Sequence, residues 1–269
     1  MFTEPAPTPY DLNWTMFGIH VRVHPFFWLM CLLMSSTGGE LNLTHLAIWI
    51  GCVFVSILIH ELGHVWMGQV FGSRGHIVLH SFGGLAIGSA NLRRRWQRIA
   101  VSAAGPAAGF IFLGLLLALL WAVNPDAFPI YLRSTARMLG IPVDGFPRAQ
   151  VLPNPVLAIA VFDLIFINLM WGILNLLPVW PLDGGQITRE LCEGVSEDRG
   201  FTTAMGISMM TAGVLALHCF VVASGREFLP IPIGGLYAGI LFTVLAVQSF
   251  LAMQQAYQRR RWTEQHWDD

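Results

Sequence analysis

The segment His60-Glu-Leu-Gly-His64 carries two histidines four positions apart, with a glutamate directly after the first. On an α-helix, residues four apart lie one above the other, so both imidazoles can bind one metal ion. In this pattern the glutamate stands beside the reacting water as a general base and is not a ligand. A catalytic zinc has three protein ligands and one exchangeable position. The motif therefore predicts a zinc hydrolase site that still needs a third ligand.

The composition of the chain places this motif in a membrane protein. Of 269 residues, 55% are hydrophobic and 12% are charged, and the mean hydropathy is +0.59; soluble domains carry roughly a quarter charged residues. The net charge is -1 and all 15 basic residues are Arg, so the chain has no basic footprint and nucleic-acid binding is excluded.

The four cysteines are scattered without metal-ligand spacing and are interpreted as small apolar residues. No cleavable signal peptide is evident in the first twenty residues.

A bilayer core requires about 20 apolar residues per helix. The sequence offers about six such segments, and the first of them is short. Their approximate bounds are His24 to Ser36, Thr44 to Phe71, Ile99 to Val123, Val156 to Pro178, Ala204 to Ala223 and Ile233 to Met253. We therefore predict an all-α polytopic membrane protein with about six transmembrane helices.

The arginines predict how these segments are oriented, because Lys and Arg accumulate on the cytoplasmic side. With six spans, one side receives eleven arginines and the other receives four, which are Arg133, Arg137, Arg148 and Arg226. This split predicts a multi-pass protein of the cytoplasmic (inner) membrane with both termini in the cytoplasm. The second and fourth spans then both run inward, and the active site lies toward the cytoplasm.

This orientation selects between two candidates for the third zinc ligand. Asp183 follows the fourth span and is predicted to lie at the same membrane depth as His60 and His64. Asp163 lies twenty residues earlier, or about 30 Å along a helix. We therefore predict that Asp183 is the ligand and that Asp163 is a hydrogen-bonded or cavity-lining residue, as intramembrane carboxylates usually have a partner.

The segment from His76 to Ala90 repeats the histidine spacing at His76 and His80 but has no glutamate between them. It is bracketed by glycines and rich in β-branched and apolar residues, which favours short strands or a hairpin after the second span. The two imidazoles then need not converge on a metal. We predict instead that an exposed strand edge of this segment, including Gly83 and Gly84, binds the substrate.

Three stretches of the chain together resemble the site-2 protease family of intramembrane zinc metalloproteases. They are HELGH at 60–64, the Gly83-Gly84-Leu-Ala turn with Ala103-Ala-Gly-Pro-Ala-Ala-Gly109, and Asn175-Leu-Leu-Pro-Val-Trp-Pro-Leu-Asp183-Gly-Gly. The segment Gly18 to Pro25 is similar to the family's approach to its first helix. In the latter part of the second stretch, Gly105 and Gly109 also have the spacing that permits close helix packing in membranes.

The resemblance implies one zinc ion per chain, held by His60, His64 and Asp183, with Glu61 as base and Asn175 near the substrate backbone or the oxyanion. It implies a catalytic and substrate-binding role for Asn175, and cleavage of a transmembrane protein substrate in regulated proteolysis signalling. No loop is long enough for an inserted PDZ domain, and no CBS-like region follows the last helix. We therefore expect residues 1–269 to form a single transmembrane metalloprotease domain.

Two other functional classes remain open on the sequence. One is an inactive zinc-binding pseudoprotease, against which the presence of Glu61 argues without deciding. The other is a metal transporter, which would be expected to carry ligands along the whole membrane depth, whereas here they gather at one end. The sequence does not indicate an oligomeric state.

Overall fold

The computed structural model describes most of the chain, in two compact units. The described residues are 4–35, 42–80, 83–88, 92–143, 152–226, 228–229, 231 and 233–266. The first unit is Met1–Ile173 and the second is Leu174–Asp269. Each unit is described by itself.

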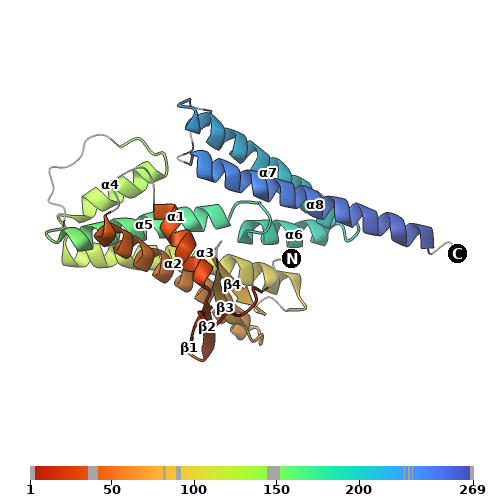
Figure 1. Ribbon diagram of the computed structural model, residues 1–269, viewed down its shortest axis with the longest axis horizontal. Helices are drawn as coiled ribbons and strands as arrows, with labels where there is room; N and C mark the ends of the chain where they lie inside the picture. The colour runs from red at the N-terminus through yellow and green to blue at the C-terminus, as the bar shows by residue number, and fades with distance from the viewer. Residues whose placement is uncertain are drawn as a thin grey trace. The chain divides into compact units, whose positions relative to one another are not determined.

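The first unit holds a small sheet and most of the helices, and the boundary between the units falls near the end of α5 (Figure 1). Its elements are β1 (Leu12–Met16), β2 (Ile19–Val23), α1 (Pro25–Ser35), α2 (Leu43–Val70), β3 (His76–His80), β4 (Gly83–Ile87), α3 (Arg95–Val123), α4 (Phe128–Met138) and α5 (Pro155–Asn175). The second unit contains α6 (Asp183–Val195), α7 (Gly200–Ala223) and α8 (Leu236–His266).

Five of the described helices, α2, α3, α5, α7 and α8, are long and apolar enough to cross a membrane. The prediction of a helical polytopic membrane protein is confirmed. The first expected span differs, because helix α1 has 11 residues and a length of about 16 Å. That is shorter than the roughly 30 Å core of a bilayer.

The sheet has the strand order β1-β2-β3-β4. Strands β3 and β4 form an antiparallel pair, which confirms the prediction of strands after the second span. Strands β1 and β2 were not expected, and they add a hairpin at the N-terminal side of the sheet. Its two-residue turn uses Phe17 and Gly18, both with positive φ, as tight hairpins require.

Strands β2 and β3 pair in parallel, with Val23 opposite Leu79. Because β2 precedes α1 and β3 follows α2, the chain leaves the sheet through α1 and returns to it through α2. The segments before α1 and after α2 therefore lie on the same side of this helix pair.

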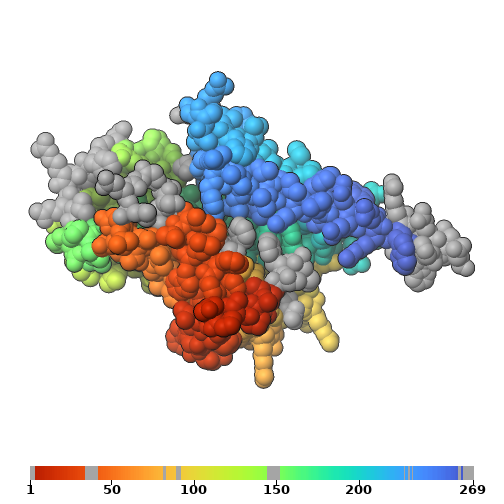
Figure 2. Space-filling model, viewed as in Figure 1, coloured from red at the N-terminus to blue at the C-terminus, as the bar shows by residue number. Residues whose placement is uncertain are grey.

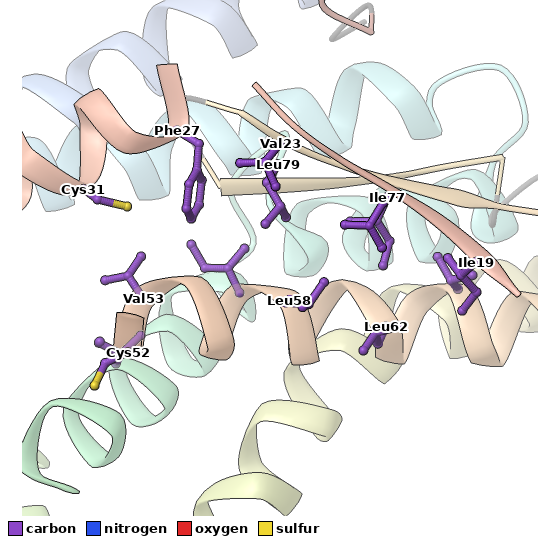
Figure 3. Close-up of a cluster of buried hydrophobic side chains, with 14 residues drawn as sticks. Ile19, Val23, Phe27, Cys31, Cys52, Val53, Leu58, Leu62, Ile77 and Leu79 are labelled. Carbon is purple, nitrogen blue, oxygen red and sulfur yellow. The ribbon is translucent and has the colours of Figure 1, made fainter. Parts of the chain in front are cut away.

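The sheet packs against α2 through its apolar face. Figure 3 shows Ile77 and Leu79 of β3 directed toward Leu58 and Leu62 of α2, and all four side chains are buried. Close van der Waals packing among these side chains holds the sheet against the helix. This cluster fixes the sheet on the half of α2 that carries the histidine motif.

In the second unit, α7 and α8 run side by side as a helical hairpin (Figure 2), and α6 packs on α7. Helices α4 and α6 were not predicted. Both are short and mix polar with apolar residues, so neither produces the continuous apolar run on which the span prediction depends. The four cysteines are free, and three of them are buried, which agrees with their interpretation as small apolar residues.

Candidate metal centre

The residues His60, Glu61 and His64 lie on consecutive turns of α2 and are 4%, 4% and 6% exposed. Their potential ligand atoms all lie within 4.8 Å of one another. The Nε2 atoms of the two histidines are 3.2 Å apart. Two nitrogens bound to a tetrahedral zinc at 2.0–2.1 Å are separated by about 3.3 Å. The pair therefore fits a zinc ion with little adjustment.

The tautomer of His64 is determined by helix α3. The Nδ1 atom of His64 lies 2.7 Å from the carbonyl oxygen of Val101. Since a carbonyl oxygen only accepts, Nδ1 carries the proton and Nε2 keeps its lone pair. A backbone acceptor behind the ring is the usual way of orienting a metal-binding histidine. The Nε2 lone pair is thus directed toward His60.

Glu61 lies beside the two histidines and against strand β4. Its Oε1 atom is 4.0 Å from Nε2 of His60. A Cβ atom added to Gly84 would overlap Cγ and the carboxyl group of Glu61. The backbone of β4 therefore passes in direct contact with the carboxylate, and only a glycine at position 84 permits this.

Helix α3 approaches α2 closely at the level of the motif. A Cβ atom at Gly63 would overlap the carbonyl oxygen of Ala104, and one at Gly105 would overlap the imidazole of His64. The prediction that small residues in 103–109 permit close packing is confirmed for this pair of helices. The sequence did not indicate that the packing partner of Gly105 is a candidate zinc ligand.

We expect Gly105→Ala to weaken zinc binding at least tenfold, because the added methyl displaces the His64 ring from Val101 and such supporting contacts contribute 10- to 100-fold to metal affinity. Gly109→Ala is the matched control on the same helix. Its Cβ would lie 3.6 Å from Oδ1 of Asn168, an ordinary contact. Zinc affinity is measured by chelator competition with each purified variant. Equal affinities in the two variants would contradict this role of Gly105.

The remaining predicted site residues, Asn175 and Asp183, lie in the second unit. Asn175 is the last residue of α5, Asp183 is the first residue of α6, and both are buried. Gly184 and Gly185 are helical and have no positive φ. A Cβ on Gly185 would meet the backbone of Val179 and Trp180 at 2.5 Å. These glycines thus allow close approach of α6 to the preceding loop.

A hydrogen-bond chain anchors the loop before Asp183. The N–H of Trp180 donates to Oγ of Ser208 on α7 at 2.7 Å, and the Oγ atoms of Ser208 and Ser249 on α8 are 2.7 Å apart. Ser249 donates to the carbonyl of Leu245 at 2.9 Å, so Ser208 donates to Ser249. Both serines are buried. The loop that leads into Asp183 is therefore fixed to both helices of the α7–α8 hairpin.

The alternative carboxylate, Asp163, lies at the far end of α2 from the motif. Its Oδ2 atom is 3.9 Å from Nε2 of His45, and His45 precedes His60 by fifteen residues, or about 22 Å of helix. Asp163 lines a cavity there, as predicted. It is too far from the histidine pair to be its third ligand.

The second histidine pair, His76 and His80, stands at the two ends of β3. Four residues of a strand span about 13 Å, so the two side chains do not converge, as predicted. His76 lies 3.3 Å from Glu4, and the ring of His80 packs on that of His24. Burial lowers the pKa of His80, and the neighbouring His24 and Arg22 lower it further.

Comparison with known proteins gives the family. Residues 48–219 match the family model of peptidase family M50. The chain belongs to peptidase family M50. The resemblance to site-2 proteases noted in the sequence, and with it the prediction of a zinc metallopeptidase, is confirmed at the level of the family.

Two curated relatives and one solved structure are similar over much of the chain. A zinc metalloprotease of Methanocaldococcus jannaschii is 26% identical over 74% of this chain and 50% of its own length. Stage IV sporulation protein FB of Bacillus subtilis is 29% identical over 91% of this chain and 70% of its own length. A solved site-2 protease from Methanocaldococcus jannaschii is 22% identical with a TM-score of 0.48, covering 93% of this chain and 94% of that one. The chain thus spans half of the archaeal curated relative.

Proposed function

We propose that this M50 family member is a zinc-dependent intramembrane endopeptidase that hydrolyses a peptide bond in or near a transmembrane segment of another membrane protein. The observation that supports this most directly is the position of the motif. His60 and His64 are buried within α2, a membrane-length apolar helix of 28 residues, and not in a flanking loop. The proposed role is regulated proteolysis in signalling.

The proposed zinc site needs both units of the chain. His60 and His64 would hold one zinc ion per chain together with Asp183, and we propose that residues 1–269 form one catalytic domain for this reason. Bound there, zinc would lower the pKa of water toward 7 and polarise the scissile carbonyl. Among the described residues, the group of His and Glu side chains that could hold a metal consists of His60, Glu61 and His64. A metal transporter would be expected to carry ligands along the whole membrane depth, so this grouping does not favour a transport path.

Glu61 is proposed to move the proton during hydrolysis. Its carboxylate takes a proton from water as the water oxygen bonds to the carbonyl carbon, and it gives that proton to the amine nitrogen as the carbon–nitrogen bond breaks. Asn175 is proposed to donate a hydrogen bond to the substrate backbone or to the oxyanion. Glu61 is held for this role by its contact with Gly84.

Strand β4 is the proposed docking edge for the substrate. It is the end strand of the sheet, with β3 as its neighbour among the described strands. The N–H of His24 donates to the carbonyl of Leu79, so the backbone of Leu79 faces β2 and that of its opposite residue, Gly84, faces the outer edge. Gly84 is also the residue in contact with Glu61. A substrate strand added at this edge would run past the catalytic carboxylate.

Strand addition predicts a period of two in the substrate. In a synthetic transmembrane peptide methylated on one backbone nitrogen at a time, methylation should slow cleavage at alternate positions, since only alternate N–H groups face β4. Each lost hydrogen bond should cost about 2- to 10-fold in rate. Rates are compared by mass spectrometry of the products. Equal effects at neighbouring positions would contradict docking on β4.

We also propose that the protein is located in the cytoplasmic (inner) membrane, with both termini and the active site toward the cytoplasm. With the five membrane-length helices, the arginines between α2 and α3, between α5 and α7 and at the end of α8 outnumber those between α3 and α5 and between α7 and α8. This distribution supports a cytoplasmic position for the histidine-motif end of α2. The parallel pairing of β2 with β3 supports the assignment of Arg22 and Arg74 to one side.

The function is tested with purified protein in lipid nanodiscs and a panel of peptides that each contain one transmembrane segment. We expect products cut within or next to the apolar segment, loss of cleavage after zinc removal by a chelator, and recovery when zinc is restored. A zinc-loaded protein that binds these peptides and cuts none of them would be a pseudoprotease. Cleavage that continues unchanged without zinc would contradict the proposed chemistry.

A further inference from the structure

The first unit contains a cavity that is separate from the metal centre. It has a volume of about 390 Å³ and lies between α2, α4 and α5, which is within the size range of small-ligand sites. Apolar side chains, among them Ile130, Ile159 and Phe162, form most of its wall. Its polar lining includes His45 and Asp163.

Asp163 provides a buried acceptor without a hydrogen-bond donor. The residue is 6% exposed, and its Oδ2 atom has no hydrogen-bond partner among the described residues. Nε2 of His45, at 3.9 Å, is beyond hydrogen-bond distance. The Tyr131 hydroxyl in the same wall donates to the carbonyl of Ala158 at 3.3 Å. A buried carboxylate oxygen that accepts no hydrogen bond is costly, and carboxylates in membranes usually have a hydrogen-bonded or charged partner.

We propose that this cavity binds the primary ammonium headgroup of a membrane lipid, with the ammonium on Asp163 and the apolar part of the lipid along Ile159 and Phe162. A cation with N–H donors satisfies both the charge and the missing hydrogen bond of Oδ2. Most of the wall is apolar, and two of the three helices that form it, α2 and α5, are membrane-length, which suits a lipid better than a soluble amine. The metal centre lies about 22 Å away along α2, so this site is a separate one.

The test compares lipids that differ only in the headgroup. Purified full-length protein in neutral detergent is mixed with phosphatidylethanolamine, phosphatidylcholine and phosphatidylglycerol of identical acyl chains, and retained lipid is counted by native mass spectrometry. The first lipid has a cation with N–H donors, the second a cation without them, and the third no cation. We expect about tenfold preference for phosphatidylethanolamine, the scale of one hydrogen bond to a charged group.

A matched pair of variants assigns the preference to Asp163. Asp163→Asn should reduce the retention of phosphatidylethanolamine to that of phosphatidylcholine. Asp126→Asn, which removes an exposed carboxylate outside the cavity lining, should leave it unchanged. Equal retention of the three lipids by the parent would overturn the proposal, and this comparison decides even if Asp163→Asn does not fold. A preference that persists in a folded Asp163→Asn variant would also overturn it.

Discussion

Replacement of Glu61 by Gln is expected to lower the rate of peptide-bond cleavage by about 10³-fold, while the zinc content of the protein stays at the level of the parent. General acid–base catalysis contributes about 10²- to 10⁴-fold, and an amide cannot accept the proton from water. The amide has nearly the same shape as the carboxylate, so the contact with Gly84 is preserved. Zinc is retained because the glutamate of this motif is not a ligand.

Glu193→Gln is the control for this variant. Glu193 lies 3.6 Å from Arg189 with 27% of its side chain exposed, and such partly exposed ion pairs contribute little. The same chemical change there should leave cleavage within about twofold. Cleavage is measured on one transmembrane peptide, and zinc by elemental analysis of each purified protein. Cleavage by Glu61→Gln at the parent's rate would exclude Glu61 as the base, and loss of zinc would indicate that Glu61 is a ligand instead.

The histidine motif could be predicted from the sequence because its geometry is local. Positions 60 and 64 face the same side of any α-helix, and the structure shows their Nε2 atoms 3.2 Å apart. The strands within 76–90 were also predictable, since glycines and β-branched residues mark them. The hairpin of β1 and β2 carried a signal that we did not use, a two-residue turn ending in Gly18 between two short alternating segments.

The supporting contacts of the site could not be predicted, because they join elements that are distant in the chain. Gly105 meets His64 only because α3 crosses α2 at Gly63, and Gly84 meets Glu61 only because the sheet packs on α2. Each such contact involves a glycine whose neighbour depends on tertiary packing, and spacing in the sequence contains no information about it. Small residues in these positions indicate close approach, without naming the partner.

The choice of Asp183 over Asp163 as the third zinc ligand had a different basis, since it depended on the predicted orientation of the helices in the membrane and not on spacing. The exclusion of Asp163 no longer depends on the arginine count. Asp163 is excluded as a ligand by its position next to His45, at the opposite end of α2 from His64. Asp183 remains the proposed ligand, and its loop is fixed by Trp180 and Ser208.

Asp183→Asn is therefore expected to weaken zinc binding by at least about 100-fold and to abolish cleavage. Loss of a supporting residue alone typically costs 10- to 100-fold in metal affinity, and a direct ligand should cost more. Two histidines would remain, and a catalytic zinc requires three protein ligands. The affinity is measured by chelator competition, with size-exclusion chromatography of each variant to show that it is folded.

Asp163→Asn provides the comparison, because it makes the identical substitution in another buried aspartate. It should retain zinc with the affinity of the parent, since Asp163 lies about 22 Å along α2 from the motif. If Asp183→Asn binds zinc as tightly as the parent, the third ligand lies elsewhere and the two units need not meet at one metal. If Asp163→Asn loses zinc while remaining folded, the exclusion of Asp163 is wrong. The pair of measurements thus tests whether the second unit completes a centre that begins with two histidines on one helix.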